Sequence, residues 1–283
     1  MDERQAEIEK SIVKKFKKTI WHRFVGALKD YELINEGDKV AVCISGGKDS
    51  MLLAKCVQEL KRRSKVNFDA EFIVMNPGYN KENIDRIVSN AEIMGIPIRI
   101  FDANIFNYVY KQEGSPCYLC ARMRRGYLYK EAQSLGCNKI ALGHHFNDVI
   151  ETTMLNMMYG AQIKTMLPKL RSTNYAGMEL IRPLYLIREE DIIAWARYNS
   201  LSFIQCACRF TEQTAHGENI SKRKEMKELI EHMKQSNPAA DLNIFRSLHN
   251  VNLSQIVSFR ESDGIELVSF PEKYNSDCDN SEI

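Results

Sequence analysis

The chain has 283 residues, of which 44% are hydrophobic and 27% are charged, with a formal net charge of +2. This composition predicts an ordinary folded core, and no window approaches the roughly 18 to 20 apolar residues of a transmembrane helix, which excludes one. The opening MDERQAEIEK is charged where a signal peptide would be apolar, so we expect a cytoplasmic protein without membrane contact. In that compartment the eight cysteines favour metal ligation or thiol chemistry over disulfides.

Helix-like and strand-like patterns alternate along the chain. Residues 7–31 place apolar side chains at a helical period, which predicts an amphipathic helix. Apolar runs predict strands at 39–44, 68–75, 96–101, 139–142 and 180–184, with helices such as 81–94 and 189–198 following them. The alternation predicts an open parallel α/β sheet with helices on both faces. The predicted parts are an N-terminal amphipathic helix (1–35), an α/β catalytic domain (36–210), a C-terminal helical region (211–260) and a loose acidic tail (261–283).

The segment SGGKDS, residues 45–50, joins the first predicted strand to a helix. Gly46 and Gly47 permit close approach to the backbone, and the first amides of the helix point into the turn. Lys48 adds a cation, and Ser45 and Ser50 add hydroxyl donors for phosphate oxygens. We therefore expect an anion site at the carboxyl edge of the sheet. Adjacent glycines exclude a Walker loop, and the segment instead resembles the S-G-G-x-D-S loop of PP-loop ATP pyrophosphatases, which holds the pyrophosphate portion of ATP.

Cysteine pairs mark a candidate metal centre. Cys117 and Cys120 form a C-x-x-C just before a predicted helix whose first turn is rich in arginine. Two thiolates at this spacing can converge on one metal centre, and neighbouring arginines favour the thiolate form. Cys206 and Cys208 follow far along the chain, and one of them can close the same site, because alternate side chains of an extended segment point opposite ways. The cysteines in apolar surroundings are expected to be buried small hydrophobes, namely Cys43, Cys56 and Cys137.

The strand predicted at 139–142 leads into a third polar segment, GHHFND. His144 and the histidine after it leave this strand on the rim of the sheet that also carries SGGKDS. Asp148 and Glu151 lie near the start of the next helix. For each histidine a structural, hydrogen-bonded role and a ligand-binding role both stay open.

Together, SGGKDS, PCYLCARMRRG, IALGHHFND, IRPL and the downstream cysteine pair resemble the tRNA 2-thiocytidine synthetase (TtcA) family of PP-loop enzymes, over residues 12–257. The resemblance implies an adenine nucleotide alpha hydrolase-like fold and an enzyme that uses ATP to adenylate the C2 oxygen of an anticodon-loop cytidine. It further implies that sulfur handled by a three-cysteine [4Fe–4S] cluster replaces this oxygen, which gives 2-thiocytidine, AMP and pyrophosphate. The implied partners are tRNA and a sulfur donor such as a cysteine desulfurase, with a homodimer as a possible assembly.

The resemblance also implies roles for the matched residues. The nucleotide-binding residues would be Ser45, Gly46, Gly47, Lys48, Asp49, Ser50, Gly143 and His144, and the catalytic residues Lys48, Asp49 and Asp148. The cluster ligands would be Cys117, Cys120 and Cys208, and the tRNA contacts Arg122, Arg124 and Arg125. Cys206 is the alternative third ligand, because this chain has C-x-C where the family pattern is C-x-x-C. Asp49 and Asp148 are candidates for binding Mg²⁺. Many relatives have an acid at the position of Asn147, so whether two adjacent carboxylates act together here, as in a second magnesium contact, stays open.

Other readings of these motifs predict different chemistry. A 2-thiouridine synthase of the TtuA kind also joins a PP-loop to a three-cysteine cluster, but typically carries extra zinc-binding motifs at both ends. The first 42 residues contain no cysteine, which favours the cytidine reading. A lysidine synthetase would need no cluster. A protein without enzymatic activity could instead bind nucleotide and hold zinc with all four cysteines of the two pairs.

Overall fold

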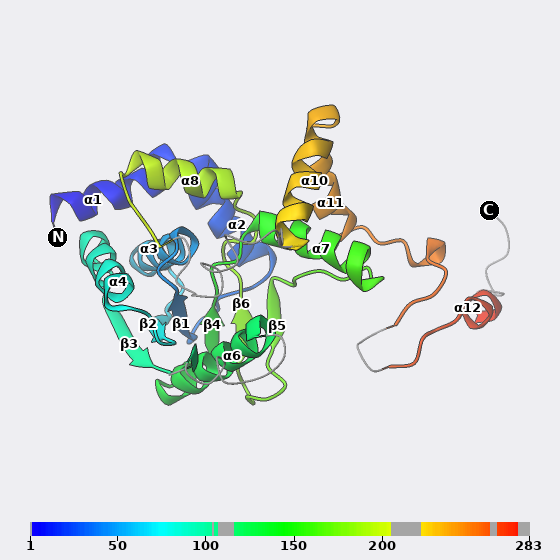
Figure 1. Cartoon of the computed structure of the whole chain (residues 1–283), viewed down its shortest axis with the longest axis horizontal. Helices are drawn as coiled ribbons and strands as arrows, with labels where there is room; N and C mark the ends of the chain where they lie inside the picture. Colours follow the sequence, from blue (N-terminus) through cyan, green and yellow to red (C-terminus); the bar gives the residue numbers. More distant parts are fainter. Residues whose placement is uncertain (1, 104, 107–115, 205–221, 261–264, 277–283) are drawn as a thin grey trace. The chain divides into compact units, whose positions relative to one another are not determined.

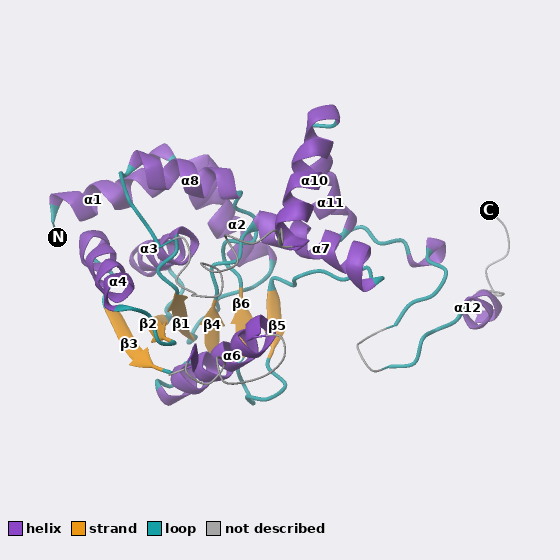
Figure 2. Cartoon of the chain, in the orientation of Figure 1, coloured by secondary structure: helices purple, strands orange, loops and turns teal. Residues whose placement is uncertain are grey.

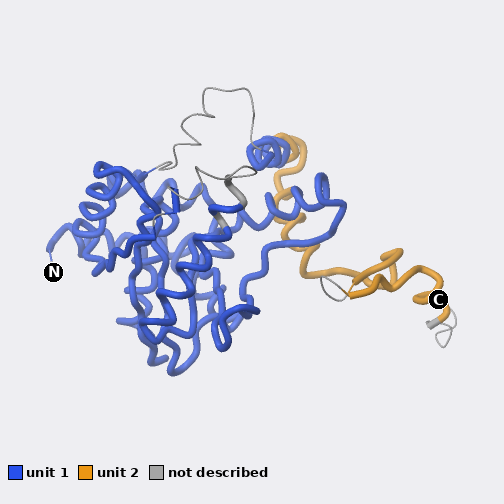
Figure 3. Tube along the Cα trace, turned by 60° about the horizontal axis from the view of Figure 1, so that its bottom comes forward, with its two compact units in different colours: residues 1–231 blue, residues 232–283 orange. Residues whose placement is uncertain are grey.

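A computed structural model describes residues 2–103, 105–106, 116–204, 222–260 and 265–276. The chain divides into two compact units, 1–231 and 232–283 (Figure 3). The domain limits expected from the sequence stay a prediction. The strands are β1 (Lys39–Ile44), β2 (Asp69–Asn76), β3 (Ile98–Asp102), β4 (Lys139–Ala141), β5 (Lys169–Arg171) and β6 (Glu179–Ile181). The helices are α1 (Glu3–Lys10), η1 (Ser11–Lys15), η2 (Lys17–Trp21), α2 (His22–Asp30), α3 (Lys48–Arg63), α4 (Lys81–Met94), α6 (Pro116–Ser134), α7 (Phe146–Gly160), α8 (Glu189–Tyr198), α10 (Lys222–Ser236), α11 (Ala240–Ser247), η3 (Leu253–Gln255) and α12 (Phe270–Ser276).

The described strands form one sheet in the order β3-β2-β1-β4-β6-β5 (Figure 1). All neighbours are parallel except β5 and β6, which are antiparallel. Helices lie on both sides of the sheet (Figure 2), which confirms the predicted open α/β fold. The chain runs outward from β1 to β3 and then returns through α6 to β4, on the other side of β1. The boundary between the neighbouring strands β1 and β4 is therefore the topological switch point. In such sheets, ligands bind at the carboxyl ends of the strands on either side of this point.

The central strand β1 is buried on both faces, as an apolar strand of a parallel sheet should be. Ala41 and Cys43 pack against Tyr129 and Ala132 of α6. Because successive side chains point to opposite faces, Val40, Val42 and Ile44 face the helices on the other side of the sheet. The three cysteines expected in the core are buried there: Cys43, Cys56 and Cys137. Burial raises the pKa of Cys43 to about 12 and that of Cys137 to about 11, so these thiols stay protonated.

Several elements differ from the sequence-based expectation. The predicted strand over 180–184 ends at Ile181, because Arg182 donates its amide to the Pro168 carbonyl and Pro183 has no amide to donate. The short edge strand β5 was not predicted at all. The helix predicted over 7–31 is instead divided into α1, two π-helical turns and α2.

The π-helical turns connect the N-terminal helix to α8. Hydrogen bonds from the amide of Phe16 to the Ser11 carbonyl, and from Trp21 to Phe16, widen the helix at this point. The Ser11 hydroxyl accepts hydrogen bonds from the Trp195 indole, at 3.2 Å, and from the Asn199 amide, at 3.1 Å. All three side chains belong to buried residues, so the polar interior of this contact is satisfied.

A buried ion network joins α1, α3 and α4. Lys55 is fully buried and donates to Glu9 Oε1 and to the Met94 carbonyl, both at 2.7 Å. Arg62 donates to the other oxygen of Glu9 at 2.8 Å and also lies 2.9 Å from Glu59. Burial acts to raise the pKa of Glu9, but the hydrogen bonds from Arg62 and Lys55 outweigh it and hold this pKa below its usual 4.5.

We predict that Glu9→Gln destabilises the protein by roughly 3 kcal/mol at pH 7, because it leaves the buried Lys55 ammonium without its counter-charge. The stabilisation should be fully present above pH 4.5 and be lost as the pH falls through the lowered pKa of Glu9. Denaturant unfolding at several pH values measures both effects. Glu7→Gln is the matched control, since the exposed Glu7 pairs only with Arg4 on the surface among its described contacts. Equal stability of the two variants would contradict the assigned role of the network.

Candidate active site

The SGGKDS loop closes on itself at the carboxyl end of β1. Gly46 has a φ of +86°, and a Cβ there would lie 2.7 Å from Ile87 Cγ1 and 2.9 Å from Ile204 Cδ1, so only glycine fits without rearrangement. Ser50 Oγ accepts from the Ser45 amide at 3.1 Å and donates to the Gly47 carbonyl at 2.9 Å. Since Gly47 is the N-cap of α3, the turn presents the first amides of that helix, as an anion site requires.

The turn after β4 lies directly against this loop. A Cβ on Gly143 would be 3.0 Å from the Ser50 amide nitrogen and 3.1 Å from the Asp49 carbonyl carbon. Because these neighbours are backbone atoms, a side chain at position 143 would have to push the Asp49–Ser50 backbone back by a few tenths of an ångström, so the close contact favours glycine. This geometry confirms that the segments after β1 and β4 share one rim of the sheet.

The two predicted catalytic carboxylates flank a histidine. His145 Nε2 lies 3.8 Å from Asp49 Oδ1, and His145 Nδ1 lies 3.5 Å from Asp148 Oδ2. Asp148 also accepts the His145 amide at 2.9 Å, which caps α7. Burial raises the pKa of Asp49, although His145 and Lys48 act to lower it. Within the described residues, no group of three or more histidine, cysteine and acidic side chains is arranged to hold a metal ion, so the Mg²⁺ role of Asp49 and Asp148 stays a prediction.

His144 is a partly buried, neutral histidine beside the loop. Burial lowers its pKa to about 4, so the imidazole is uncharged at neutral pH. Its Nδ1 atom is buried and makes no hydrogen bond to the described part of the chain. A neutral ring nitrogen without a partner in this position is available to a bound ligand.

Lys48 has a second partner that the sequence did not reveal. Its Nζ lies 3.2 Å from Asp49 Oδ1 and 3.0 Å from Glu189 Oε1, and Glu189 also binds Lys227 of α10 at 2.5 Å. Burial acts to raise the pKa of Glu189, but hydrogen bonds from Lys227 and Lys48 outweigh it and lower this pKa to about 2. In the sequence, Glu189 belongs to an acidic first turn of a helix, a pattern that usually means only dipole compensation.

Arg223 of α10 provides a further cation. It donates to Asp148 at 2.9 Å and lies 3.4 Å from Glu151, which is buried. Burial raises the pKa of Glu151 to about 7, although Arg223 acts to lower it. Asn147 accepts the Glu189 amide at 3.0 Å and so fixes the start of α8.

The C-x-x-C segment lies within a helix rather than before one, because α6 begins at Pro116, a residue suited to the first position of a helix. Positions 117 and 120 are thus one turn apart. Cys120 is partly buried and packs against Met75 and Ala103, at the carboxyl ends of β2 and β3. The side chain of Cys117 and all of Cys206 and Cys208 lie outside the described residues.

The three predicted tRNA contacts differ in their surroundings. Arg122 and Arg125 are exposed on α6. Arg124 is partly buried, donates to the Tyr79 hydroxyl at 2.9 Å and lies 5.8 Å from the Phe106 ring centre. Arg124 is therefore already engaged within the protein, whereas the other two guanidinium groups face solvent.

The chain is similar in sequence to proteins of known family. A PP-loop domain model matches residues 10–209, so the chain is a PP-loop protein. The tRNA-cytidine(32) 2-sulfurtransferase of Geobacter metallireducens is 37% identical over 229 residues, which cover 80% of this chain and 86% of that protein. The protein of the same name from Methylobacillus flagellatus is 38% identical over 235 residues, 81% of this chain and 75% of that protein. The chain belongs to the tRNA-cytidine(32) 2-sulfurtransferase family, which confirms the resemblance found in its motifs.

A solved structure has the same fold. The U34-tRNA thiolase NcsA from Methanococcus maripaludis, with its [4Fe–4S] cluster, superposes with a TM-score of 0.66 at 23% identity. The match covers 90% of this chain and 84% of that one. Among the described residues, no helix has both the length and the apolar character needed to cross a membrane.

We predict that Gly143→Ala weakens ATP binding by about tenfold or more, or 1.4 kcal/mol, because the added methyl group displaces the Asp49–Ser50 backbone. Titration calorimetry with ATP measures the loss. Gly126→Ala is the control, since its Cβ would meet only the Tyr175 hydroxyl, at 3.7 Å, and alanine is favoured within a helix. Wild-type affinity in Gly143→Ala would show that the close contact between the two turns does not shape the nucleotide site.

Proposed function

We propose that the protein thiolates a cytidine of the tRNA anticodon loop in an ATP-dependent reaction that releases 2-thiocytidine in the tRNA, AMP and pyrophosphate. One observation carries the proposal: the SGGKDS loop and Cys120 lie at the carboxyl edge of the same sheet. The edge thus joins a nucleotide-activating motif to a candidate cluster ligand. Relatives named tRNA-cytidine(32) 2-sulfurtransferases support the choice of base.

In the first half of the reaction, the C2 oxygen of the base attacks the α-phosphorus of ATP, and pyrophosphate leaves. The free amides at the start of α3 and the Lys48 ammonium stabilise the negative charge on the departing group. Burial acts to lower the pKa of Lys48, but Asp49 and Glu189 raise it above its usual value and keep the ammonium protonated. We assign Asp49 and Asp148 to Mg²⁺, with Gly143 allowing the close approach and His144 contacting the nucleotide.

In the second half, sulfur displaces AMP from the activated base. A [4Fe–4S] cluster held by three cysteines would supply this chemistry when bound, because one of its irons keeps an open coordination position. We assign Cys117, Cys120 and Cys208 as its ligands, with Cys206 as the alternative to Cys208. The partly buried position of Cys120 beside Met75 and Ala103 fits a cluster shielded from solvent.

The proposed partners follow from this chemistry. The exposed Arg122 and Arg125 suit tRNA phosphates, since planar guanidinium groups bind them in bidentate fashion. We extend the assignment to Arg124, whose guanidinium group would have to give up its hydrogen bond to the Tyr79 hydroxyl in order to bind an RNA phosphate. A sulfur donor such as a cysteine desulfurase would feed the cluster, and the enzyme could act as a homodimer.

We predict that Cys117→Ser loses the cluster and all thiolation but binds ATP as the wild type does. After anaerobic purification, iron and sulfide analysis with a visible spectrum measures the cluster, and calorimetry measures ATP binding. Cys137→Ala is the control, because that thiol is buried in the core beside Ile140. A colourless wild-type protein with stoichiometric zinc, after failed cluster reconstitution, would instead assign the cysteines a structural role.

Asp49→Asn serves as the reciprocal variant in the same experiment. It should retain the iron and sulfide content of the wild type while losing pyrophosphate release, because the change affects only the nucleotide half of the site. Cys206→Ser and Cys208→Ser are compared in the same way, and the variant that loses iron identifies the third ligand. If protein without cluster still thiolates tRNA, the proposed mechanism is wrong.

A further inference from the structure

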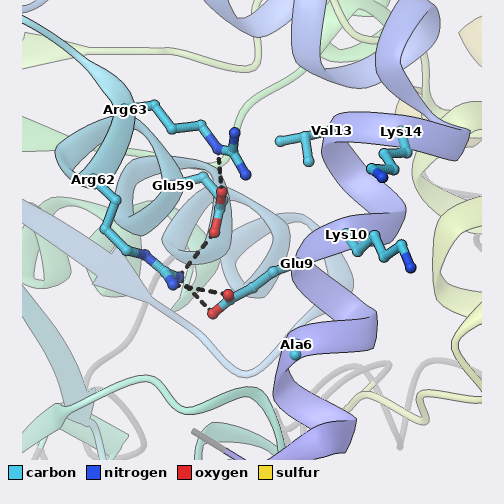
Figure 4. A pocket seen from close by; sticks show the side chains of 8 residues that line it. All are labelled: Ala6, Glu9, Lys10, Val13, Lys14, Glu59, Arg62 and Arg63. Carbon is cyan, nitrogen blue, oxygen red and sulfur yellow. Dashed lines mark hydrogen bonds and ion pairs between the residues drawn. The ribbon is translucent and has the colours of Figure 1, made fainter.

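A groove of about 440 Å³ lies between the N-terminal helix and the last turns of α3 (Figure 4). One wall comes from α1 and η1, and the other from α3, at the end of this helix that is remote from the SGGKDS loop. The lining side chains are Ala6, Glu9, Lys10, Val13, Lys14, Glu59, Arg62 and Arg63. Four of these are cations and two are carboxylates, so the lining carries an excess of positive charge.

The two carboxylates are already neutralised within the protein. Glu59 is only 2% exposed and binds Arg63 at 2.7 Å, while Glu9 binds Arg62 and the buried Lys55. Dashed lines in Figure 4 mark the contacts of Arg62 and Arg63 with the two glutamates. These ion pairs fix the α3 wall of the groove and leave no unneutralised carboxylate to repel an incoming anion.

The α1 wall carries the surplus charge. Lys10 and Lys14 lie four positions apart on the groove side of this wall, and both are exposed. The side chain of neither lysine forms an ion pair or hydrogen bond with any other described residue of the chain. Their ammonium groups are therefore available to an external anion without breaking an internal contact.

We propose that this groove binds the sugar–phosphate backbone of tRNA, at a place on the RNA distant from the base that reacts. This inference rests on the proposed function, which supplies tRNA as the substrate. Cations spread over two walls suit a polyanion better than a single phosphate ion. A membrane surface is a poorer fit, because Ile8 and Ile12, the apolar face of this helix, are fully buried and cannot enter a bilayer.

The groove and the nucleotide loop lie at opposite ends of α3, which sets the distance between the two sites that would contact tRNA. Lys48 begins α3 and Arg62 lies near its end, 14 residues further along. At the rise of an α-helix, this separation corresponds to a distance of ~21 Å along the helix axis. One continuous helix therefore connects the nucleotide loop to the groove. A tRNA with its anticodon loop at the carboxyl edge can reach the groove with a different part of the same molecule.

The test compares tRNA binding by the full-length wild type, Lys10→Glu and Lys14→Glu across a salt series, with filter binding as the readout. Each lost phosphate contact should reduce the slope of log Kd against log salt by about 0.9, so each variant should bind about eightfold more weakly at 0.1 M salt and like wild type near 1 M. Lys29→Glu is the matched control, because it changes net charge equally at an exposed residue of α2 outside the groove. ATP affinity, unchanged in all three variants, confirms that they fold.

Three outcomes would overturn the groove as an RNA contact. Both variants could retain the wild-type Kd and salt slope, or Lys29→Glu could lose as much affinity as they do, which would indicate a general field effect. The variants could also keep tRNA binding but lose binding to phosphatidylserine vesicles, which would assign the groove to a membrane surface. A wild type that does not bind tRNA at any salt concentration would instead overturn the proposed function itself.

Discussion

The close contact between two strand-to-helix turns is the constraint on which the rest of the site depends. Gly143, after β4, lies against the Asp49–Ser50 backbone, after β1, so closely that a Cβ would make a tight contact of 3.0 Å with the Ser50 amide nitrogen. This contact is possible only because β1 and β4 are neighbours at the switch point of the sheet. It brings the loop amides, Lys48, Asp49, His144 and Asp148 together at one edge of the sheet. Without it the same motifs would be separate turns.

Charge at this edge is balanced by residues from distant parts of the chain. Lys48 is shared between Asp49 and Glu189, and α10 adds Lys227 and Arg223 to the acidic side chains. A triphosphate that enters the loop competes for these cations, because its oxygens are stronger partners than a carboxylate in an ion pair that is partly exposed. We therefore expect nucleotide binding to weaken the ion pairs that hold the first turns of α10.

Local sequence patterns predicted the elements well where a periodic apolar face or a turn motif was present. The limits of α4 and α8 agree with the expectation, and the loop residues lie at the predicted edge of the sheet. The π-helical turns around Phe16 were not predicted, because the apolar period of residues 7–31 also fits a continuous α-helix, and the contacts of Ser11 with Trp195 and Asn199 that accompany the turns are long-range. The end of β6 before Pro183 was missed because an apolar run does not show where pairing stops.

The partners of the site residues were harder to predict than the residues themselves. No local motif marks Arg223 as a site residue, because its carboxylate partner Asp148 is 75 positions away in sequence. In the sequence, Glu189 has the appearance of an acid that only compensates the helix dipole in the first turn of α8. Arg124 was grouped with two exposed arginines, although Tyr79 already binds it. In each case the sequence identified the chemical group, but long-range packing decides what that group contacts.

The most direct test of the account is nucleoside analysis of unmodified tRNA after anaerobic incubation with cluster-loaded protein, sulfide and Mg·ATP. The account predicts 2-thiocytidine, detected by mass spectrometry, that forms only when ATP is present and in amounts matched by released AMP. The appearance of 2-thiouridine instead, or tRNA left unmodified by protein with a full complement of iron and sulfide, would contradict it.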